Sequence, residues 1–271
     1  MHPLPEQPPI EAATDVLDGG HLWLLELIDG LPCRFRLGSD GVVRFADGER
    51  PFDGDDPPLG YGAAVREVRE RLNRRALRAA VDDVEAVTFV GVAPVRRSLA
   101  YDWDRTPAFL GIDVLNGDDG EVLAPDRAEA AYERLGVTPV NALRKEVRAA
   151  DFDPDAYDPP ASTWRAGPPF GTLIRNKGGG RAVVRRDPDS GVDDPGATDA
   201  ATVVASFVED GGLDRAGATG AKGRSGEPGS FERAWEALTR ERYRRFVGHD
   251  AVDRTAAREA LATATGRRAD G

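Results

Sequence analysis

Lysine is nearly absent from this sequence. Of the 36 Lys and Arg residues in 271, only three are lysines: Lys145, Lys177 and Lys222. Cysteine occurs once, which excludes an internal disulfide and a paired-cysteine metal site. The three histidines are scattered without the spacing of metal ligands, so we expect no metal site.

Long apolar runs are missing as well. None approaches the roughly 18 residues that a membrane-spanning helix needs, so no membrane partner is expected. The Pro-rich residues 1–10 contain no apolar signal core. These absences predict a cytoplasmic protein.

Acidic charge is abundant. The 47 Asp and Glu residues give a formal net charge of -11, and Arg supplies almost all of the positive charge. An acidic, lysine-poor composition is typical of halophilic, archaeal-like proteins, whose surfaces stay solvated in concentrated salt. At molar salt the Debye length is about 3 Å, so the net charge does not exclude an RNA partner.

Periodicity divides the chain into strands and helices. Apolar or alternating segments predict strands at 21–28, 32–37, 42–45, 86–92, 108–115, 172–175 and 181–186. Helical spacing predicts helices at 63–81, 125–135 and 231–247, a short one at 142–147, and one more after residue 248. Residues 187–200 and 211–229 are poor in apolar residues and rich in Gly and Asp, which indicates loops.

The order of these elements predicts an α+β fold, in which antiparallel sheets are flanked by helices. We expect a flexible lead-in at 1–20 and a core at 21–187. A mobile acidic, Gly-rich segment at 188–229 and a C-terminal helical segment at 230–271 would follow.

Four segments, taken in order, resemble the motifs of ATP-dependent RNA ligases. Residues 26–30 read ELIDG where that family has EKxDG, and residues 88–92 read TFVGV around the family's FGE. Residues 107–114 read PAFLGIDV, similar to FxxFDV, and residues 170–176 read FGTLIRN, similar to EGxVIR. Residues 181–183 then resemble the family's RAK. The resemblance implies a ligase-type nucleotidyltransferase core, which is ATP-grasp-like, over roughly residues 15–187.

The departures from the family pattern bear on the chemistry. Leu27 stands where the family has the lysine that attacks ATP, and a leucine has no lone pair with which to attack. Val92 and Phe170 stand where it has glutamates, and Val183 replaces a second lysine. Pro32 occupies a position that is polar in the family. We therefore expect no catalytic residue, and no requirement for ATP or Mg²⁺.

Several polar residues remain as candidates for contact with nucleotide or RNA. Five match the family pattern: Glu26, Asp29, Gly30, Asp113 and Arg175. Arg44 or Arg50 can stand for a substrate-binding arginine, and Arg181 opens the last basic strand. Lys177, beside three glycines, is the lysine expected nearest the cleft. Its Gly-rich turn suits either a phosphate or a plain hairpin.

Three functions follow from these features. The first is a catalytically inactive RNA-ligase-like protein that binds RNA ends or an active ligase paralogue. The second is a divergent, active RNA ligase that uses ATP and Mg²⁺ with Lys177 or another nucleophile. The third is a protein-interaction module that binds neither nucleotide nor RNA. An Arg-lined groove favours RNA, whereas a contiguous apolar patch favours a protein partner.

Overall fold

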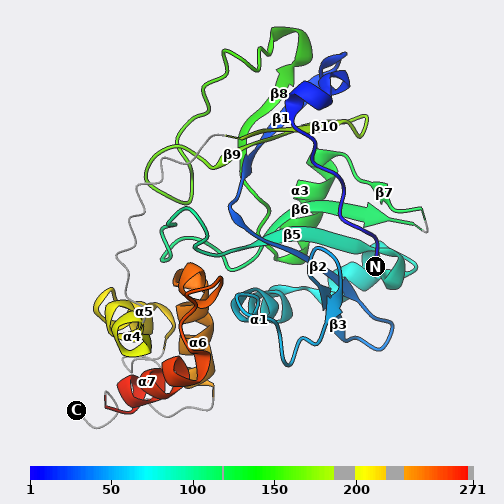
Figure 1. Cartoon of the computed structure of the whole chain (residues 1–271). Helices are drawn as coiled ribbons and strands as arrows, with labels where there is room; N and C mark the ends of the chain where they lie inside the picture. The colour runs from blue at the N-terminus through cyan, green and yellow to red at the C-terminus, as the bar shows by residue number, and fades with distance from the viewer. Residues whose placement is uncertain (118, 186–198, 218–228, 268–271) are drawn as a thin grey trace.

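Two antiparallel sheets form the body of the protein (Figure 1). In the computed structural model, residues 1–117, 119–185, 199–217 and 229–267 are described. The small sheet has the strand order β10-β9-β1-β8, and the large sheet has the order β4-β3-β2-β5-β6-β7. The α+β fold class is thus confirmed. The chain passes from one sheet to the other between β1 and β2, at Ile28 and Asp29.

Seven of the ten strands in the described residues match the predicted apolar or alternating segments, and β4, β7 and β8 do not. The small sheet comprises β1 (His21–Leu27), β8 (Ala142–Arg148), β9 (Gly171–Asn176) and β10 (Arg181–Arg185). The large sheet comprises β2 (Gly30–Leu37), β3 (Val43–Ala46), β4 (Pro51–Phe52), β5 (Thr88–Pro94), β6 (Leu110–Asn116) and β7 (Glu121–Val122). The segments predicted at 32–37, 42–45, 172–175 and 181–186 correspond to β2, β3, β9 and β10.

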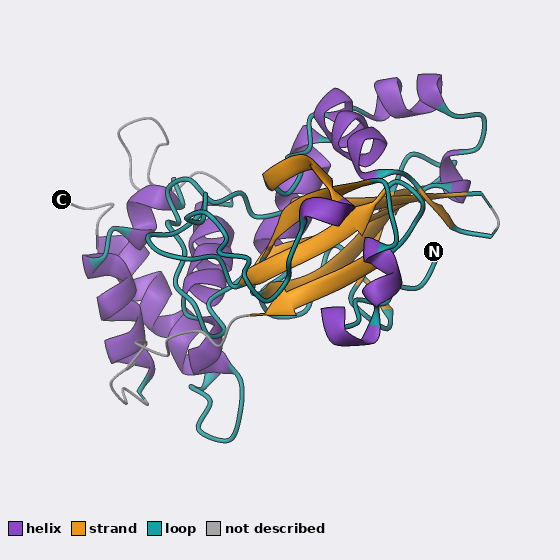
Figure 2. Ribbon diagram, turned by 90° about the horizontal axis from the view of Figure 1, so that it is seen from above, coloured by secondary structure: helices purple, strands orange, loops and turns teal. Residues whose placement is uncertain are grey.

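Helices cover the large sheet and form a separate group at the C-terminus (Figures 1 and 2). They are α1 (Gly62–Arg71), α2 (Arg74–Ala80), α3 (Pro125–Leu135), α4 (Ala200–Glu209), α5 (Gly212–Arg215), α6 (Ser230–Glu241) and α7 (Arg254–Arg267). At the centre of the large-sheet core Phe35 stacks on Phe89, and Phe109 and Tyr132 of α3 pack edge-on against this pair. Among the described residues, no helix combines the length and apolarity needed to cross a membrane.

The single helix predicted over 63–81 is in fact two. Leu72 leaves the helical region, with φ -59° and ψ 113°. The side chain of Asn73 then caps α2 by accepting a hydrogen bond from the backbone N–H of Ala76. Asn is a favoured N-cap because its side-chain oxygen satisfies a free backbone donor. The apolar periodicity continues across the break and conceals it.

The short helix predicted over 142–147 is wrong, because these residues form β8. This strand pairs with β1, with His21 opposite Arg148 and Leu25 opposite Ala142. Its Ala, Leu, Arg, Lys and Glu residues favour a helix locally. Pairing with the open edge of β1 overrides that weak preference, as tertiary context commonly does.

The predicted flexible lead-in at 1–20 is packed onto the small sheet. Ile10 and Val16 are buried, and the backbone N–H of Val183 donates to the carbonyl of Pro8 at 2.8 Å. At its start, Arg34 Nη1 donates to the carbonyl oxygen of His2. Residues 8–17 therefore cover the outer edge of β10, whereas His2 contacts β2 of the large sheet.

Two helices lie inside the segment predicted as a mobile loop. Helix α4 begins where Asp199 accepts a hydrogen bond from the backbone N–H of Thr202 at 2.8 Å, and α5 follows it. Phe207 of α4 is fully buried against Leu238 of α6 and Leu261 of α7. Residues 188–198 and 218–228 of that predicted segment lie outside the described residues.

Candidate functional site

A cleft of about 830 Å³ lies between the two sheets, beside the β1–β2 passage. Its walls come from the end of β1, the start of β2, the middle of β5 and β6, and the facing ends of β9 and β10. Leu4, Pro5 and Gln7 of the N-terminal segment also line it. Residues from the whole length of the chain therefore meet here.

The positions that depart from the ligase pattern gather at this cleft. Leu27, Val92 and Phe170 line it, and Val183 is buried in the adjoining apolar cluster. Strand pairing explains the convergence, because Leu27 lies opposite Gly171 and Val183 lies opposite Leu173. The cleft floor is therefore apolar at the positions where the resemblance implies lysine and glutamate side chains.

Asp29 lies in the cleft, but its carboxylate is engaged. One oxygen accepts hydrogen bonds from Ser98 N at 2.7 Å, Ser98 Oγ at 2.6 Å and Leu99 N at 3.3 Å. The backbone N–H of Asp29 donates to the Tyr101 hydroxyl at 2.6 Å. Burial raises the pKa of Tyr101 above its ordinary value, so this phenol stays protonated at neutral pH. The observed role of Asp29 is to anchor the loop after β5, beside the cleft residue Gly30.

Glu26 does not line the cleft. Its side chain is 2% exposed, and its carboxylate accepts hydrogen bonds from Ser162 Oγ and, at 3.1 Å, from the backbone N–H of Thr163. Glu26 therefore ties the linker before β9 to β1.

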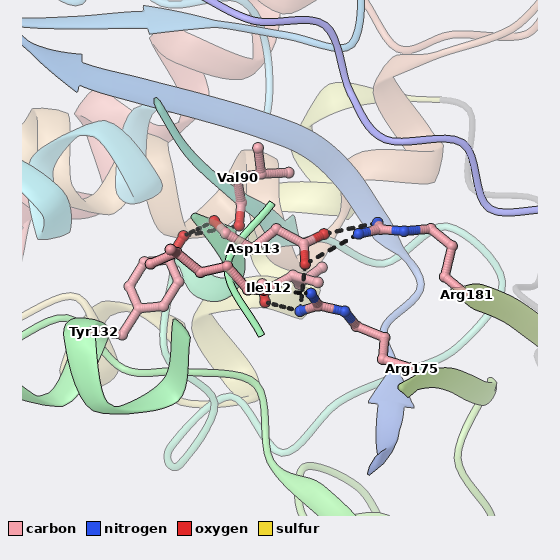
Figure 3. A network of polar contacts seen from close by, with 7 residues as sticks. Val90, Ile112, Asp113, Tyr132, Arg175 and Arg181 are labelled. Atoms are coloured by element: carbon pink, nitrogen blue, oxygen red, sulfur yellow. Dashed lines mark hydrogen bonds and ion pairs between the residues drawn. The ribbon is translucent and has the colours of Figure 1, made fainter. Parts of the chain in front are cut away.

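Asp113, Arg175 and Arg181 form a polar bridge between the sheets (Figure 3). Asp113 of β6 pairs with Arg175 of β9, and its second oxygen lies 2.9 Å from Arg181 Nη1 of β10. Arg175 also donates to the carbonyl of Leu123 at 2.7 Å. Burial lowers the pKa of Arg175, and the Asp113 carboxylate opposes that shift. Because the Asp113 and Arg175 side chains are 1% exposed, a ligand has no access to them in this state.

The other basic candidates lie away from the cleft. Arg44 is exposed and pairs with Asp40 at 2.8 Å, and Arg50 is exposed; neither lines the cleft. Lys177 pairs with Glu146 at 2.8 Å, which holds the pKa of its ammonium above the ordinary value. Lys177 follows the last residue of β9, whereas Phe170 precedes the first. At roughly 3.3 Å per strand residue, the two residues lie about 20 Å apart.

Lys177 is thus not the near-cleft lysine that the sequence indicated. Lys145 of β8 pairs with Glu129 of α3, and Lys222 lies outside the described residues. Within the described part of the chain, no lysine lines the cleft.

Three arginines that the sequence did not single out line the cleft: Arg97, Arg185 and Arg244. All three are exposed, and they come from the loop after β5, the end of β10 and the turn after α6. Asp29 is the one acidic residue among the described residues that line the cleft. An apolar floor with a cationic rim suits an anion that also carries an apolar or aromatic group.

Comparison with solved structures shows that the fold is of the RNA-ligase nucleotidyltransferase type. The RNA ligase of Naegleria gruberi with pyrophosphate aligns with a TM-score of 0.51 at 11% identity, over 68% of this chain and 56% of the ligase. A mutant of that ligase with ATP and manganese aligns with a TM-score of 0.52 at 10% identity, over 72% and 58%.

The chain therefore spans less than three fifths of the length of those ligases, and the likeness concerns the fold alone. No protein-family model matches the sequence, and a search of curated proteins finds no match.

Proposed function

We propose that this chain is a non-adenylylating protein of RNA-ligase fold that binds RNA ends in the cleft between its two sheets. The observation that carries the proposal is the cleft itself. Its floor is apolar at Leu27, Val92 and Phe170, and exposed arginines line it. The named ligases of the same fold act on RNA, which supports the choice of ligand.

The apolar floor argues against adenylyl transfer. The reaction needs a nucleophile with a lone pair and positive groups that stabilise charge on the transferring phosphate. Leu27 and its apolar neighbours supply neither. A metal-bound nucleotide would also bury charge against hydrocarbon, which is costly without compensating partners.

The rim argues for an RNA end. Arginine binds phosphate oxygens in a bidentate manner, and such contacts do not depend on sequence. Phe170 is half-buried in the cleft and offers a surface on which a base can pack. A volume of about 830 Å³ suits one or two nucleotides rather than a duplex. A terminal 5′-phosphate would add charge at the rim.

Two assays test the proposal on the purified 271-residue chain. In the first, incubation with α-labelled ATP and Mg²⁺ should give no covalent adduct on a denaturing gel or by intact mass. A covalent adduct would overturn the proposal that the chain does not adenylylate and would favour a divergent ligase. Mapping the modified residue would then identify the nucleophile.

The second assay is fluorescence anisotropy with a 5′-phosphorylated RNA oligonucleotide at about 0.1 M salt, where phosphate contacts are weakly screened. Arg97→Glu/Arg185→Glu should weaken binding about tenfold or more, the size expected for one or two lost charge-assisted contacts. Arg50→Glu/Arg148→Glu changes the charge equally at exposed residues away from the cleft, and should have little effect. Absence of binding by the unaltered protein would overturn the RNA proposal and favour a protein-interaction module.

A further inference from the structure

A second hollow lies on the large sheet between helices α2 and α3. This α2–α3 groove has a volume of about 340 Å³. Apolar side chains from α2 and its end, from β5 and β6, and from α3 line most of it. Leu77, Phe89, Val114 and Leu135 are buried at its floor, whereas Val81 and Leu123 are partly exposed. It shares no lining residue with the cleft, since Phe89 faces the groove and its neighbour Val90 faces the cleft.

The packing of the two helices leaves the groove open. The backbone N–H of Asn73, at the start of α2, donates to the carbonyl of Leu135, at the end of α3, at 2.9 Å. The helices are joined there, and the lining continues to Asn116 at the end of β6. Ala80, Ala130 and Ala131 line the walls, and their small side chains leave room for the side chains of a binding partner.

The charge of the groove is opposite to that of the chain. Among its described lining residues none is acidic, although the sequence has 47 Asp and Glu. Its charged residues are Arg127 and Arg134 of α3, both exposed. The acidic residues Asp126 and Glu129 of the same helix pair instead with Lys177 and Lys145. Helix α3 thus presents two arginines to the groove, whereas Asp126 and Glu129 pair with lysines of the small sheet and its β9–β10 turn.

We propose that the α2–α3 groove binds an acidic amphipathic helix of a partner protein. Its apolar side chains enter the groove, and its Asp or Glu residues pair with Arg127 and Arg134. These arginines are seven residues apart on α3, about 10 Å along the axis, and share a face. Carboxylates two turns apart on a second helix match that spacing.

The groove favours a helix over an extended peptide. It runs over side chains on the face of the sheet and not along an open strand edge. An extended peptide would find no main-chain partners there, whereas a helix satisfies its own backbone hydrogen bonds. The floor favours a protein over RNA, because an apolar surface offers a phosphate backbone no polar contacts. This inference is independent of the function proposed for the cleft.

A displayed library of helical peptides tests the proposal. The library is selected on the immobilised 271-residue chain and counter-selected on Arg127→Glu/Arg134→Glu. Enriched peptides should have apolar residues at i, i+3 or i+4, and i+7, flanked by Asp or Glu. The best peptide, synthesised with a fluorescent label, should lose at least about tenfold in affinity for the double variant, as expected for two lost charge pairs.

Two further variants separate a groove contact from a general charge effect. Ala130→Trp fills the groove from an exposed position, without a change of charge, and should also weaken binding at least about tenfold. Arg50→Glu/Arg148→Glu, with the same charge change as the double variant but away from the groove, should bind the peptide normally. Thermal melts verify that each variant is folded.

Several outcomes would overturn the proposal. In the first, the selection enriches no peptide that prefers the unaltered chain to the double variant. In the second, the enriched peptides are basic or uncharged. In the third, the Arg127→Glu/Arg134→Glu and Ala130→Trp variants both bind the peptide as tightly as the unaltered chain. Self-association of the chain in sedimentation, lost in Arg127→Glu/Arg134→Glu, would show instead that the groove binds a second copy. Competition of the peptide by RNA would assign the groove to nucleic acid.

Discussion

The bridge between the sheets allows a quantitative prediction for Asp113→Ala. The substitution leaves Arg175 buried without its carboxylate and removes a partner of Arg181. Breaking a buried ion pair from one side costs about 3–5 kcal/mol. Arg175 keeps its hydrogen bond to the Leu123 carbonyl at 2.7 Å, so we expect the lower end, about 3 kcal/mol.

That loss is large against a typical free energy of unfolding of about 5–15 kcal/mol. At about 2–4 °C per kcal/mol for a chain of this size, the melting temperature should fall by roughly 6–12 °C. Urea titration followed by tryptophan fluorescence measures the free energy, and calorimetry measures the temperature. The slope of the urea titration should stay unchanged, because the same surface is exposed on unfolding.

Two controls give the result its meaning. Asp102→Ala removes an exposed pair with Arg105, 2.6 Å long, and should cost at most about 1 kcal/mol. Asp113→Ala/Arg175→Met removes both buried charges and should recover part of the loss. If Asp113→Ala costs less than about 1 kcal/mol, the bridge is not structural, and Asp113 returns as a candidate ligand contact.

Three further predictions concern the core. Burial raises the pKa of Glu67, so the folded state is penalised above that pKa and relieved as pH falls towards the ordinary 4.5. The Glu67→Gln variant should therefore be more stable than the unaltered protein at pH 7. The difference between their urea midpoints should shrink as the pH falls towards 4.5, and a difference that does not change with pH would contradict this reasoning. Burial raises the pKa of the Cys33 thiol to about 12, so iodoacetamide at pH 8 should label it only after unfolding, as mass spectrometry would show. Gly111→Ala places a Cβ 2.4 Å from the Tyr132 ring and should cost about 1–3 kcal/mol by calorimetry, whereas Gly19→Ala, with nothing within 4 Å, should cost little.

Local patterns predicted most of the sheet. Apolar alternation and hairpin turns are properties of consecutive residues, so β1, β2, β3, β9 and β10 were recognisable. The same local rules failed at β8, whose composition favours a helix but whose partner is β1. They also missed the break at Leu72 and the helix α4, where a short apolar stretch is stabilised by packing against α6 and α7.

The candidate site was predictable only in part. Leu27, Val92 and Phe170 were marked by their departure from a family pattern, and the structure brings them together. Lys177 was marked by neighbouring glycines, but the turn that holds it lies at the wrong end of β9.

Residue identity and short-range pattern belong to the sequence. By itself the sequence determined most of the strands, the α+β class and the apolar residues that line the cleft floor. It also determined that Leu27 has no lone pair, and hence what chemistry that position cannot perform. Only the tertiary structure decided that Arg97, Arg185 and Arg244 line one cleft. It also decided that Asp113 forms a buried ion pair with Arg175. These facts depend on contacts between residues far apart in the chain, which no local preference encodes.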